Sequence, residues 1–482
     1  MLSDASRRTR ALYLKARQLS EPHAHAAWQA VKNSHWKRWD ADKKRSFAIN
    51  ICVGIVIAII FQILSHGHTM EKSLNTAMDA LIRKETTVLL ASSKRCTEGG
   101  GAASSDCAVV RSKFSEKVIF IDIDHETYLR WGEPLLMPRD RLAHFLRLAD
   151  KNGARVVILD ILLDYPSPKP SEDRALRNVL EEMTRNRSRL QIVFPTLTSR
   201  IDGTSKKGIF DGLIDRNPNF HRGLPYVAFS HGDRVVRYLR YYEVTKDKDG
   251  KPKVLWSTPM LSALLFTGDA ARLLNLEERI LRDRQQKSDE AYELTLSTGR
   301  ILDISNHELY SNRIRFTLIP PGVLDSQGNL FTERLLPDEL DALQSELRDK
   351  IVVIGTSSAD KEGWYVTPIG DMPGMYIIGN GINMLLGGWQ VRDAPRWVGM
   401  LLQGLVVIFA AFMLVNFKGR PMRIVSMILI VCLVSPATYY FYRVHGIFIN
   451  SAQLFFNSLM PVLGMGWDKM FKKKKADKDE KQ

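Results

Sequence analysis

Four nearly charge-free segments constrain this chain of 482 residues more than any other feature. An α-helix needs about 20 predominantly apolar residues to cross the hydrocarbon core of a bilayer, because each residue adds only about 1.5 Å. The segments have this length and therefore predict four transmembrane helices. They lie at residues 47–65, 397–417, 424–442 and 449–467.

The basic residues indicate which side of the membrane each connection occupies. The net charge is +15, and residues 1–46 hold 11 Lys and Arg against 4 Asp and Glu. Lys and Arg are also concentrated in the turn 418–423 and in the tail 468–482. Because these residues accumulate on the cytoplasmic side of membrane proteins, we expect both termini inside, and residues 66–396 outside, a bacterial inner membrane. The long basic leader argues against a cleaved signal peptide, and clustering beside apolar segments argues against nucleic acid as a partner.

The fourth apolar segment carries amide side chains on one helix face. At helical spacing, Asn450, Gln453, Asn457 and Gly464 fall on the same side of it. Amide groups in lipid seek hydrogen-bond partners, so this face should pack against another helix. The contact lies either within the bundle of one chain or between the chains of a homo-oligomer, and the sequence leaves both open.

The stretch 118–170 predicts the core of the domain between the first and second apolar segments. It reads as an apolar strand (VIFIDID), an amphipathic helix closed by Asn-Gly, and a second apolar strand (VVILDILLD). Strands this continuously apolar are covered on both faces, as in a parallel sheet. Alternating stretches at 224–230 and 234–244 predict a hairpin. We therefore predict an α/β fold with a mixed, largely parallel sheet and flanking helices, in addition to the four transmembrane α-helices.

Two features precede this unit. Residues 66–93 should continue the first apolar segment as a helix, since Met78, Ile82 and other apolar residues recur at helical spacing. Cys96 and Cys107 then flank a Gly-, Ser- and Ala-rich loop. In an oxidising compartment such a pair predicts a disulfide-closed loop, whereas metal binding is the alternative, although no His accompanies the pair.

Carboxylates follow the two apolar strands of the opening unit. Because a βαβ crossover makes these strands parallel, we expect them to be adjacent and their carboxyl ends to share a crevice. Because side chains alternate along a strand, Asp122 and Asp124 should lie on one face. Carboxylate oxygens gathered there could bind a divalent cation or a cationic ligand, or position an arginine. The alternative is structural, because Asp at strand ends often caps loops and helices or forms salt bridges. The residues of this candidate site are Asp122, Asp124, Asp160, Asp164 and Arg139, with Thr356 and Asp360 on its rim.

Catalytic chemistry finds little support in the sequence. The chain contains no G-x-S-x-G, no H-E-x-x-H and no paired Cys/His motif. Residues 351–358 (IVVIGTSS) form a strand followed by small hydroxyl residues, but the Lys-Ser/Thr of a phosphate loop is missing. We therefore expect a non-enzymatic protein that needs no cofactor, with a divalent cation as the one possible exception.

Several motifs carry a resemblance to a known family. They are VIFIDIDHETYLRWG, PRDRLAHFLRLADKNGARVVILDILLDYPSP, DRVVR, and LRDKIVVIGTSSADKEGWYVTPIGDMPGMYIIGNGINMLLGG, followed by three closely spaced apolar segments. Over about residues 66–467 the chain resembles the second type of CHASE domain, an extracellular sensory domain associated with cyclases and histidine kinases. Where that family has His-Ala-Asn in the last helix, this chain has Ile378-Gly379-Asn380.

The resemblance implies a sensory function. Family members commonly continue into a cyclase or kinase domain, whereas here a basic tail, 468–482, follows the last apolar segment. We therefore expect a membrane signal-input protein whose outer domain recognises a ligand or envelope partner and acts through a separate effector. The alternative is a structural subunit of a multi-protein envelope complex, in which the sensory fold serves for docking. In both, the partners are the lipid bilayer and other proteins.

Overall fold

The computed structural model describes most of the chain between residues 68 and 416 and a short stretch near residue 440. The described ranges, apart from scattered single residues, are 68–98, 117–196, 208–225, 228–229, 233–247, 249–285, 292–304, 312–320, 333–337, 347–358, 363–388, 390–393, 396–416, 438–442 and 446–448.

The chain divides into two compact units. Unit 1 comprises Met1–Leu74, Ala394–Thr438 and Ile449–Gln482, and its longest described helix is α12 (Arg396–Asn416). Unit 2 comprises Asn75–Asp393 and Tyr439–Phe448.

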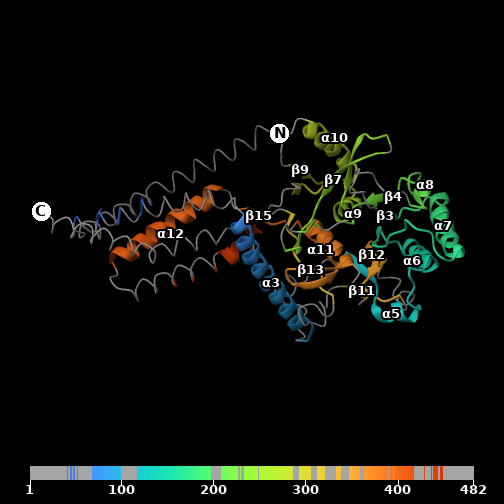
Figure 1. The fold of residues 1–482 in the computed structure, drawn as a ribbon, viewed down its shortest axis with the longest axis horizontal. Coiled ribbons are helices and arrows are strands. Elements are labelled where there is room, and N and C mark those ends of the chain that lie inside the picture. The colour runs from blue at the N-terminus through green and yellow to red at the C-terminus, as the bar shows by residue number, and fades with distance from the viewer. Residues whose placement is uncertain are drawn as a thin grey trace. The chain divides into compact units, whose positions relative to one another are not determined.

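In the described part of the chain, a six-stranded parallel sheet forms the centre of unit 2. Every neighbouring pair in it is parallel, which confirms the prediction of a largely parallel sheet. In spatial order the strands are β11 (Glu333–Leu335), β1 (Val118–Ile123), β12 (Ile351–Thr356), β2 (Val156–Leu159), β3 (Gln191–Pro195) and β4 (Phe220–Gly223). Strands β3, β4, β11 and β12 are labelled in Figure 1.

The order of the strands corrects one expectation. The two strands of the opening unit, β1 and β2, are parallel but not adjacent, because β12 pairs with both and lies between them. The register sets Asp122 of β1 beside Gly355 of β12. Periodicity within 118–170 could not reveal this insertion, because the inserted strand comes from a distant part of the chain.

Helices cover both faces of the sheet, which explains why its strands are continuously apolar. On one face, α6 (Arg139–Lys151) and α7 (Pro170–Arg185) share a buried apolar cluster with Ile119 and Ile121. On the other face lie α9 (Thr258–Thr267) and α11 (Gly374–Gly387), and the ring of Phe120 stacks on Tyr376 with centroids 4.4 Å apart. Alternation along β1 therefore directs Asp122, like Phe120, towards α11.

Smaller elements complete unit 2. The short helices are α5 (His125–Arg130) and α8 (Asp211–Ile214), and α10 (Arg272–Gln285) is longer. Within the described residues, four antiparallel strand pairs give the domain its mixed character, and the first of them lies in the segment where we predicted a hairpin. They are β5 (Ala228–Phe229) with β6 (Val236–Tyr238), β7 (Tyr242–Lys246) with β8 (Pro252–Trp256), β9 (Glu293–Thr295) with β10 (Ile301–Asp303), and β13 (Trp364–Thr367) with β14 (Gly370–Pro373).

Helix α3 (His68–Glu98) agrees with the helix predicted for residues 66–93. Its residues from Asn75 onward belong to unit 2, where Met78 and Ile82 are buried. Among the last residues of unit 2 along the chain, β15 (Arg392–Asp393) pairs in parallel with β16 (Ile447–Phe448).

Judged on the described residues alone, none of the helices combines the length and the apolarity needed to cross a membrane. The predicted segments 47–65, 424–442 and 449–467 fall mostly or wholly outside those residues, as do the amide face Asn450, Gln453, Asn457 and Gly464. The four transmembrane helices thus stay a prediction.

Gly379 of α11 should tolerate no side chain. A Cβ at this position would lie 2.4 Å from Cζ of Phe120, whose buried ring is held against Tyr376. We expect Gly379→Ala to lower the free energy of unfolding of unit 2 by about 1–3 kcal/mol, because overpacking displaces a fixed ring. Thermal unfolding of the full-length protein measures the effect. Gly212→Ala in α8, where a Cβ meets nothing within 4 Å, is the control and should change the midpoint little; equal shifts would contradict the prediction.

Candidate functional site

Two carboxylates flank β12 at the carboxyl edge of the sheet. Asp122, in β1, is buried and accepts a hydrogen bond from the Tyr376 hydroxyl at 3.0 Å. Asp160 directly follows β2, and its backbone N–H donates to the carbonyl of Ile354 at 2.8 Å. Gly355 of β12, which has no side chain, lies between them. The fold therefore brings these two predicted residues to the same edge of the sheet.

Asp160 lies against the beginning of α11. A Cβ placed on Gly374 would be 3.4 Å from Asp160 Oδ2, and one on Gly355 would be 3.2 Å from the Asp160 Cβ. Burial raises the pKa of Asp160 to about 6. Burial, together with the charge of Asp160, also raises the pKa of the neighbouring Tyr365. The edge thus holds a carboxyl group that changes its protonation in mildly acidic solution.

The other predicted site residues on the β1 and β12 side have structural contacts. The strand β1 ends at Ile123, so Asp124 does not continue its alternation but caps α5, accepting from the Thr127 N–H at 2.9 Å. The Thr356 hydroxyl donates to the Ile123 carbonyl at 2.8 Å and accepts from the Ser358 N–H at 3.1 Å. These contacts agree with the structural interpretation of both residues.

Arg139 forms a separate cluster. Its guanidinium is buried, pairs with Asp173 at 3.2 Å, donates to the Tyr165 carbonyl and lies 5.5 Å from the Phe210 ring centroid. Burial lowers the pKa of Arg139 even though Asp173, Glu172 and Asp164 oppose the change. Asp164 therefore belongs to the surroundings of Arg139. The salt bridge expected for Arg139 is present, but its partner stands in the first turn of α7, a position where acidic residues are common.

The described residues contain no group of three or more His, Cys, Asp or Glu side chains arranged to hold a metal ion. The four predicted carboxylates are instead divided among the pair flanking β12, a helix cap and the Arg139 cluster. Asp360 lies outside the described residues, as do Cys107 and the side chain of Cys96, so the disulfide stays a prediction.

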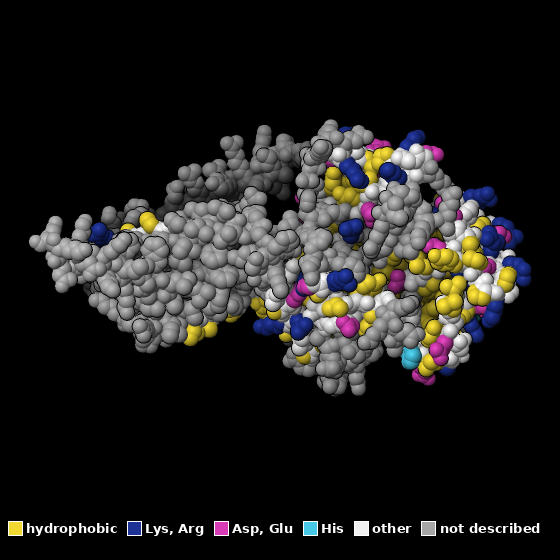
Figure 2. All heavy atoms as spheres, in the orientation of Figure 1, with side chains coloured by type: hydrophobic (Ala, Val, Ile, Leu, Met, Phe, Trp, Pro, Cys, Tyr) yellow, Lys and Arg dark blue, Asp and Glu magenta, His cyan; other side chains and the backbone are white. Residues whose placement is uncertain are grey.

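Exposed hydrophobic side chains gather on the segments that follow β1 and β2. Leu129 and Leu135 come after β1, and Leu162 and Tyr165 come after β2. Leu135 is 91% exposed. Figure 2 shows hydrophobic side chains among the charged ones on the surface around α5 and α6. Exposed apolar side chains close together are typical of interaction surfaces.

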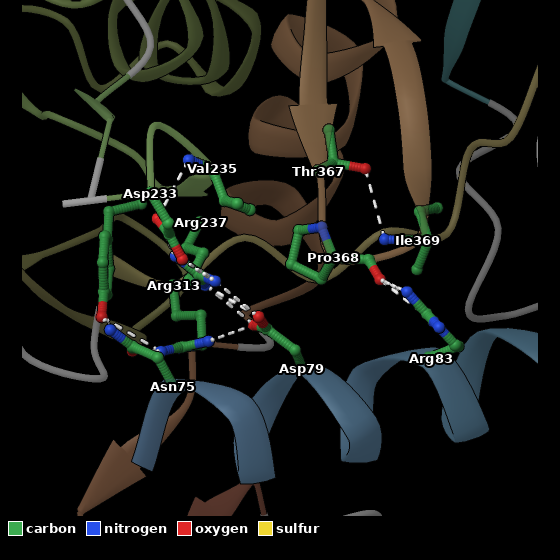
Figure 3. Close-up of polar contacts among 11 residues, drawn as sticks. Asn75, Asp79, Arg83, Asp233, Val235, Arg237, Arg313, Thr367, Pro368 and Ile369 are labelled. Carbon is green, nitrogen blue, oxygen red and sulfur yellow. Dashed lines mark hydrogen bonds and ion pairs between the residues drawn. The ribbon is translucent and has the colours of Figure 1, made fainter. Parts of the chain in front are cut away.

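A second group of functional interest, which the sequence did not reveal, is a network of charged and polar residues between α3 and the rest of unit 2 (Figure 3). Asp79 of α3 accepts hydrogen bonds from Arg237, the shortest at 2.7 Å, and from Arg313 at 3.0 Å. Asn75, one turn earlier, accepts from the Tyr238 hydroxyl at 2.8 Å and from Arg313.

The arginines that pair with Asp79 are buried, and further contacts extend along the helix. Arg237 is 4% exposed and Arg313 is 1% exposed, and Asp233 completes the pairing of Arg237 at 2.7 Å. The Arg237 hydrogen bond is the main reason why the pKa of Asp233 is lowered. Further along, Arg83 donates to the Pro368 carbonyl at 2.9 Å. Removing one partner of a buried ion pair typically costs about 3–5 kcal/mol, because the other charge stays buried. The position of α3 is therefore strongly specified.

Comparison with known protein families matches residues 54–416 to the CHASE2 domain. The chain belongs to the CHASE2 family. This is a family of sensory domains, and the match covers α3, both edges of the sheet and α11. No curated protein and no solved structure matches the chain.

The structure shows what the segment DRVVR, one of the motifs shared with the CHASE2 family, contacts. Its first and last residues, Asp233 and Arg237, stand at the centre of the α3 network. In the helix facing them, Asn75 and Asp79 are spaced four residues apart, which places them on one face. A polar pair inside an otherwise apolar helix stripe was the signal in the sequence that could have pointed to this contact.

The ionisation of Asp160 should make the CHASE2 domain less stable as pH rises. Its pKa of about 6 in the folded protein exceeds the value of an unfolded chain, so the folded state holds the extra proton between about pH 4 and 6. The stabilisation is thus full below pH 4 and is lost as pH rises through 6. At pH 8 we expect Asp160→Asn to increase the free energy of unfolding by about 2–3 kcal/mol, and at pH 4 to change it little.

Urea unfolding of the full-length protein at a series of pH values measures this difference. Asp140→Asn, which changes an exposed carboxyl in the first turn of α6, is the control and should keep the pH dependence of the wild type. An Asp160→Asn curve parallel to the wild-type curve would refute the assignment.

Proposed function

We propose that this protein is a non-enzymatic membrane sensor. Its CHASE2 domain lies outside a bacterial inner membrane, recognises a ligand or envelope partner, and changes the arrangement of four transmembrane helices. Both termini lie in the cytoplasm, where a separate effector responds. The lipid bilayer and at least one protein are thus its partners.

The observation that carries the proposal is the attachment of α3 to the α/β domain. The helix begins at His68, three residues after the predicted first transmembrane segment, 47–65. Within unit 2, Asp79 connects it to Arg237 and Arg313, which come from two different parts of the domain. A displacement of the segments that carry these arginines would therefore be passed to the helix.

Buried ion pairs suit this task because their energy depends steeply on geometry. In a low-dielectric interior, an arginine that loses its carboxylate partner stays charged and becomes costly to bury. The network therefore disfavours intermediate positions of α3 and favours a small number of well-paired arrangements. A ligand that binds one arrangement better shifts the population towards it by its differential affinity.

The surface that receives the stimulus is best sought at the carboxyl edge of the sheet. This edge carries the exposed side chains Leu129, Leu135 and Tyr165, and ligands of open α/β sheets commonly bind outside the carboxyl ends of the strands. Asp160 adds a carboxyl group that titrates near pH 6.

The competing function is that of a structural subunit that docks other envelope proteins. The contacts of Asp124 with α5, and of Arg139 with Asp173, favour it, because residues predicted to meet a ligand serve the frame of the fold instead. The two functions differ in which proteins accompany this one in the membrane and in whether α3 controls the activity of those proteins.

Affinity purification of the tagged full-length protein from its native membranes, followed by mass spectrometry and cyclase and kinase assays, separates the two. For a sensor we expect one cyclase or kinase to co-purify. We also expect Asp79→Asn to change the activity of that enzyme at least about threefold, because a change of about 0.7 kcal/mol in the equilibrium between two arrangements of α3 is enough for such an effect. A stoichiometric large assembly, unchanged in composition and activity by Asp79→Asn, would establish the structural role instead.

A further inference from the structure

A short segment near the end of the chain belongs to the α/β domain rather than to its sequence neighbours. Tyr439–Phe448 is part of unit 2, whereas the residues on either side, up to Thr438 and from Ile449, are part of unit 1. The segment takes in the last four residues of the predicted third transmembrane helix, 424–442, and runs to the start of the predicted fourth, 449–467. A simple loop between two membrane helices would not need to contact the α/β domain, yet this segment is part of it.

The carboxyl-terminal half of this segment is docked through its backbone. Strand β16 pairs with β15, and the Gly446 N–H donates to the Tyr442 carbonyl at 3.0 Å. Gly446 has a φ of +64°, and a Cβ there would lie 3.2 Å from the carbonyl oxygen of Gln390. Gln390 is itself fixed, because its amide nitrogen donates to the Tyr241 hydroxyl at 2.7 Å and to the Asp303 carbonyl at 2.8 Å. The turn at Gly446 thus lies against the backbone of a residue whose side chain is anchored.

The amino-terminal half is docked through side chains, and its contacts lead to α3. Tyr442 is completely buried, and its ring centroid lies 5.3 Å from the guanidinium carbon of Arg315. Arg315 forms a buried ion pair with Glu85 of α3. Next to it on the helix, the ammonium of Lys84 lies 4.6 Å from the ring centroid of Tyr439.

Glu85 is the charge on which this arrangement depends. Although burial disfavours the charged form of Arg315, the Glu85 carboxylate raises its pKa above the ordinary value. Without Glu85, a buried guanidinium would remain beside the Tyr442 ring with no ion-pair partner from α3. Such a charge draws in water and separates the surfaces that enclose it.

We propose that Glu85 and Arg315 couple α3 to the segment Tyr439–Phe448, so that the predicted first transmembrane helix and the predicted third and fourth helices respond to the CHASE2 domain together. The pair is a positioning device, since neither residue need touch a ligand. The inference rests on the proposed membrane topology and adds a second route by which the domain acts on the membrane helices. In this arrangement the Asp79 network fixes α3 to the domain, and the Glu85–Arg315 pair fixes the second connection to α3.

Hydrogen exchange measured by mass spectrometry on the full-length protein in lipid nanodiscs tests the coupling. For Glu85→Gln we expect the amides of Tyr439–Phe448 to exchange about tenfold faster or more, since losing a buried charged partner favours local opening. Peptides from the distant strands β2 and β3 should keep their wild-type exchange. Tyr442→Phe, which removes one hydroxyl and keeps the packed ring, should change exchange in the segment less than Glu85→Gln.

Asp79→Asn is the matched control, because it also removes a carboxylate from α3 but one that pairs with Arg237 and Arg313. It should speed exchange in α3 around Asn75 and leave Tyr439–Phe448 near the wild-type rate. The inference is overturned if Glu85→Gln leaves the segment as protected as in the wild type, or if Asp79→Asn exposes it equally. If Glu85→Gln does not fold, Arg315→Lys keeps a charge opposite Glu85 but removes the guanidinium that lies beside the Tyr442 ring. It must still speed exchange in the segment and spare β2 and β3.

These outcomes can be told apart from a failure of the proposed function. Exchange rates need no stimulus and no effector, so a structural subunit could show the coupling, and a sensor could lack it. Loss of the Asp79→Asn effect on a co-purified enzyme would count against the sensor, whereas the exchange pattern alone decides on the Glu85–Arg315 coupling.

Discussion

The pairing of β12 with both β1 and β2 is the constraint on which the rest of the α/β domain depends. Six register pairs join β12 to β1, and four join it to β2. With β12 in the middle, Gly355 separates Asp122 from Asp160, and α11, two short strands later in the chain, is brought over the face where Phe120 and Tyr376 stack. The carboxyl edge, the packing of α11 and the burial of Asp122 all follow from that one insertion.

The same arrangement shows how far the sequence could be interpreted. The continuous apolar runs of β1 and β2 predicted a sheet covered on both faces, because that property is written in each strand. Their neighbour could not be predicted, because no local pattern records which distant segment pairs with a strand. For the same reason the aspartates were placed correctly at strand ends, but the structure does not bring all four together. Asp124 follows the end of a strand and caps a helix, and Asp164 contributes to the charge around Arg139.

The charged residues of α3 illustrate a different limit. The apolar stripe containing Met78 and Ile82 was visible in the sequence and is buried as expected. The partners of Asn75, Asp79 and Glu85 lie more than 150 residues away in sequence, in segments of Arg237, Arg313 and Arg315 that look like ordinary polar strands. An isolated charge in a helix usually predicts a solvated face. Here Glu85 is buried and Asp79 is partly buried. The spacing of Asn75 and Asp79 beside the apolar stripe was a signal of their contact, but the arginines that pair with them could be identified only from the three-dimensional arrangement.

The central position of β12 also has a consequence for how the protein is made. The hydroxyl of Thr356 contacts a residue 233 positions earlier in the chain, so β1 and β2 cannot complete their pairing until nearly the whole domain has been synthesised. If the domain is exported as an unfolded chain, the sheet stays unfinished while the polypeptide is still passing through the membrane. Late closure of the sheet would then keep the chain competent for translocation.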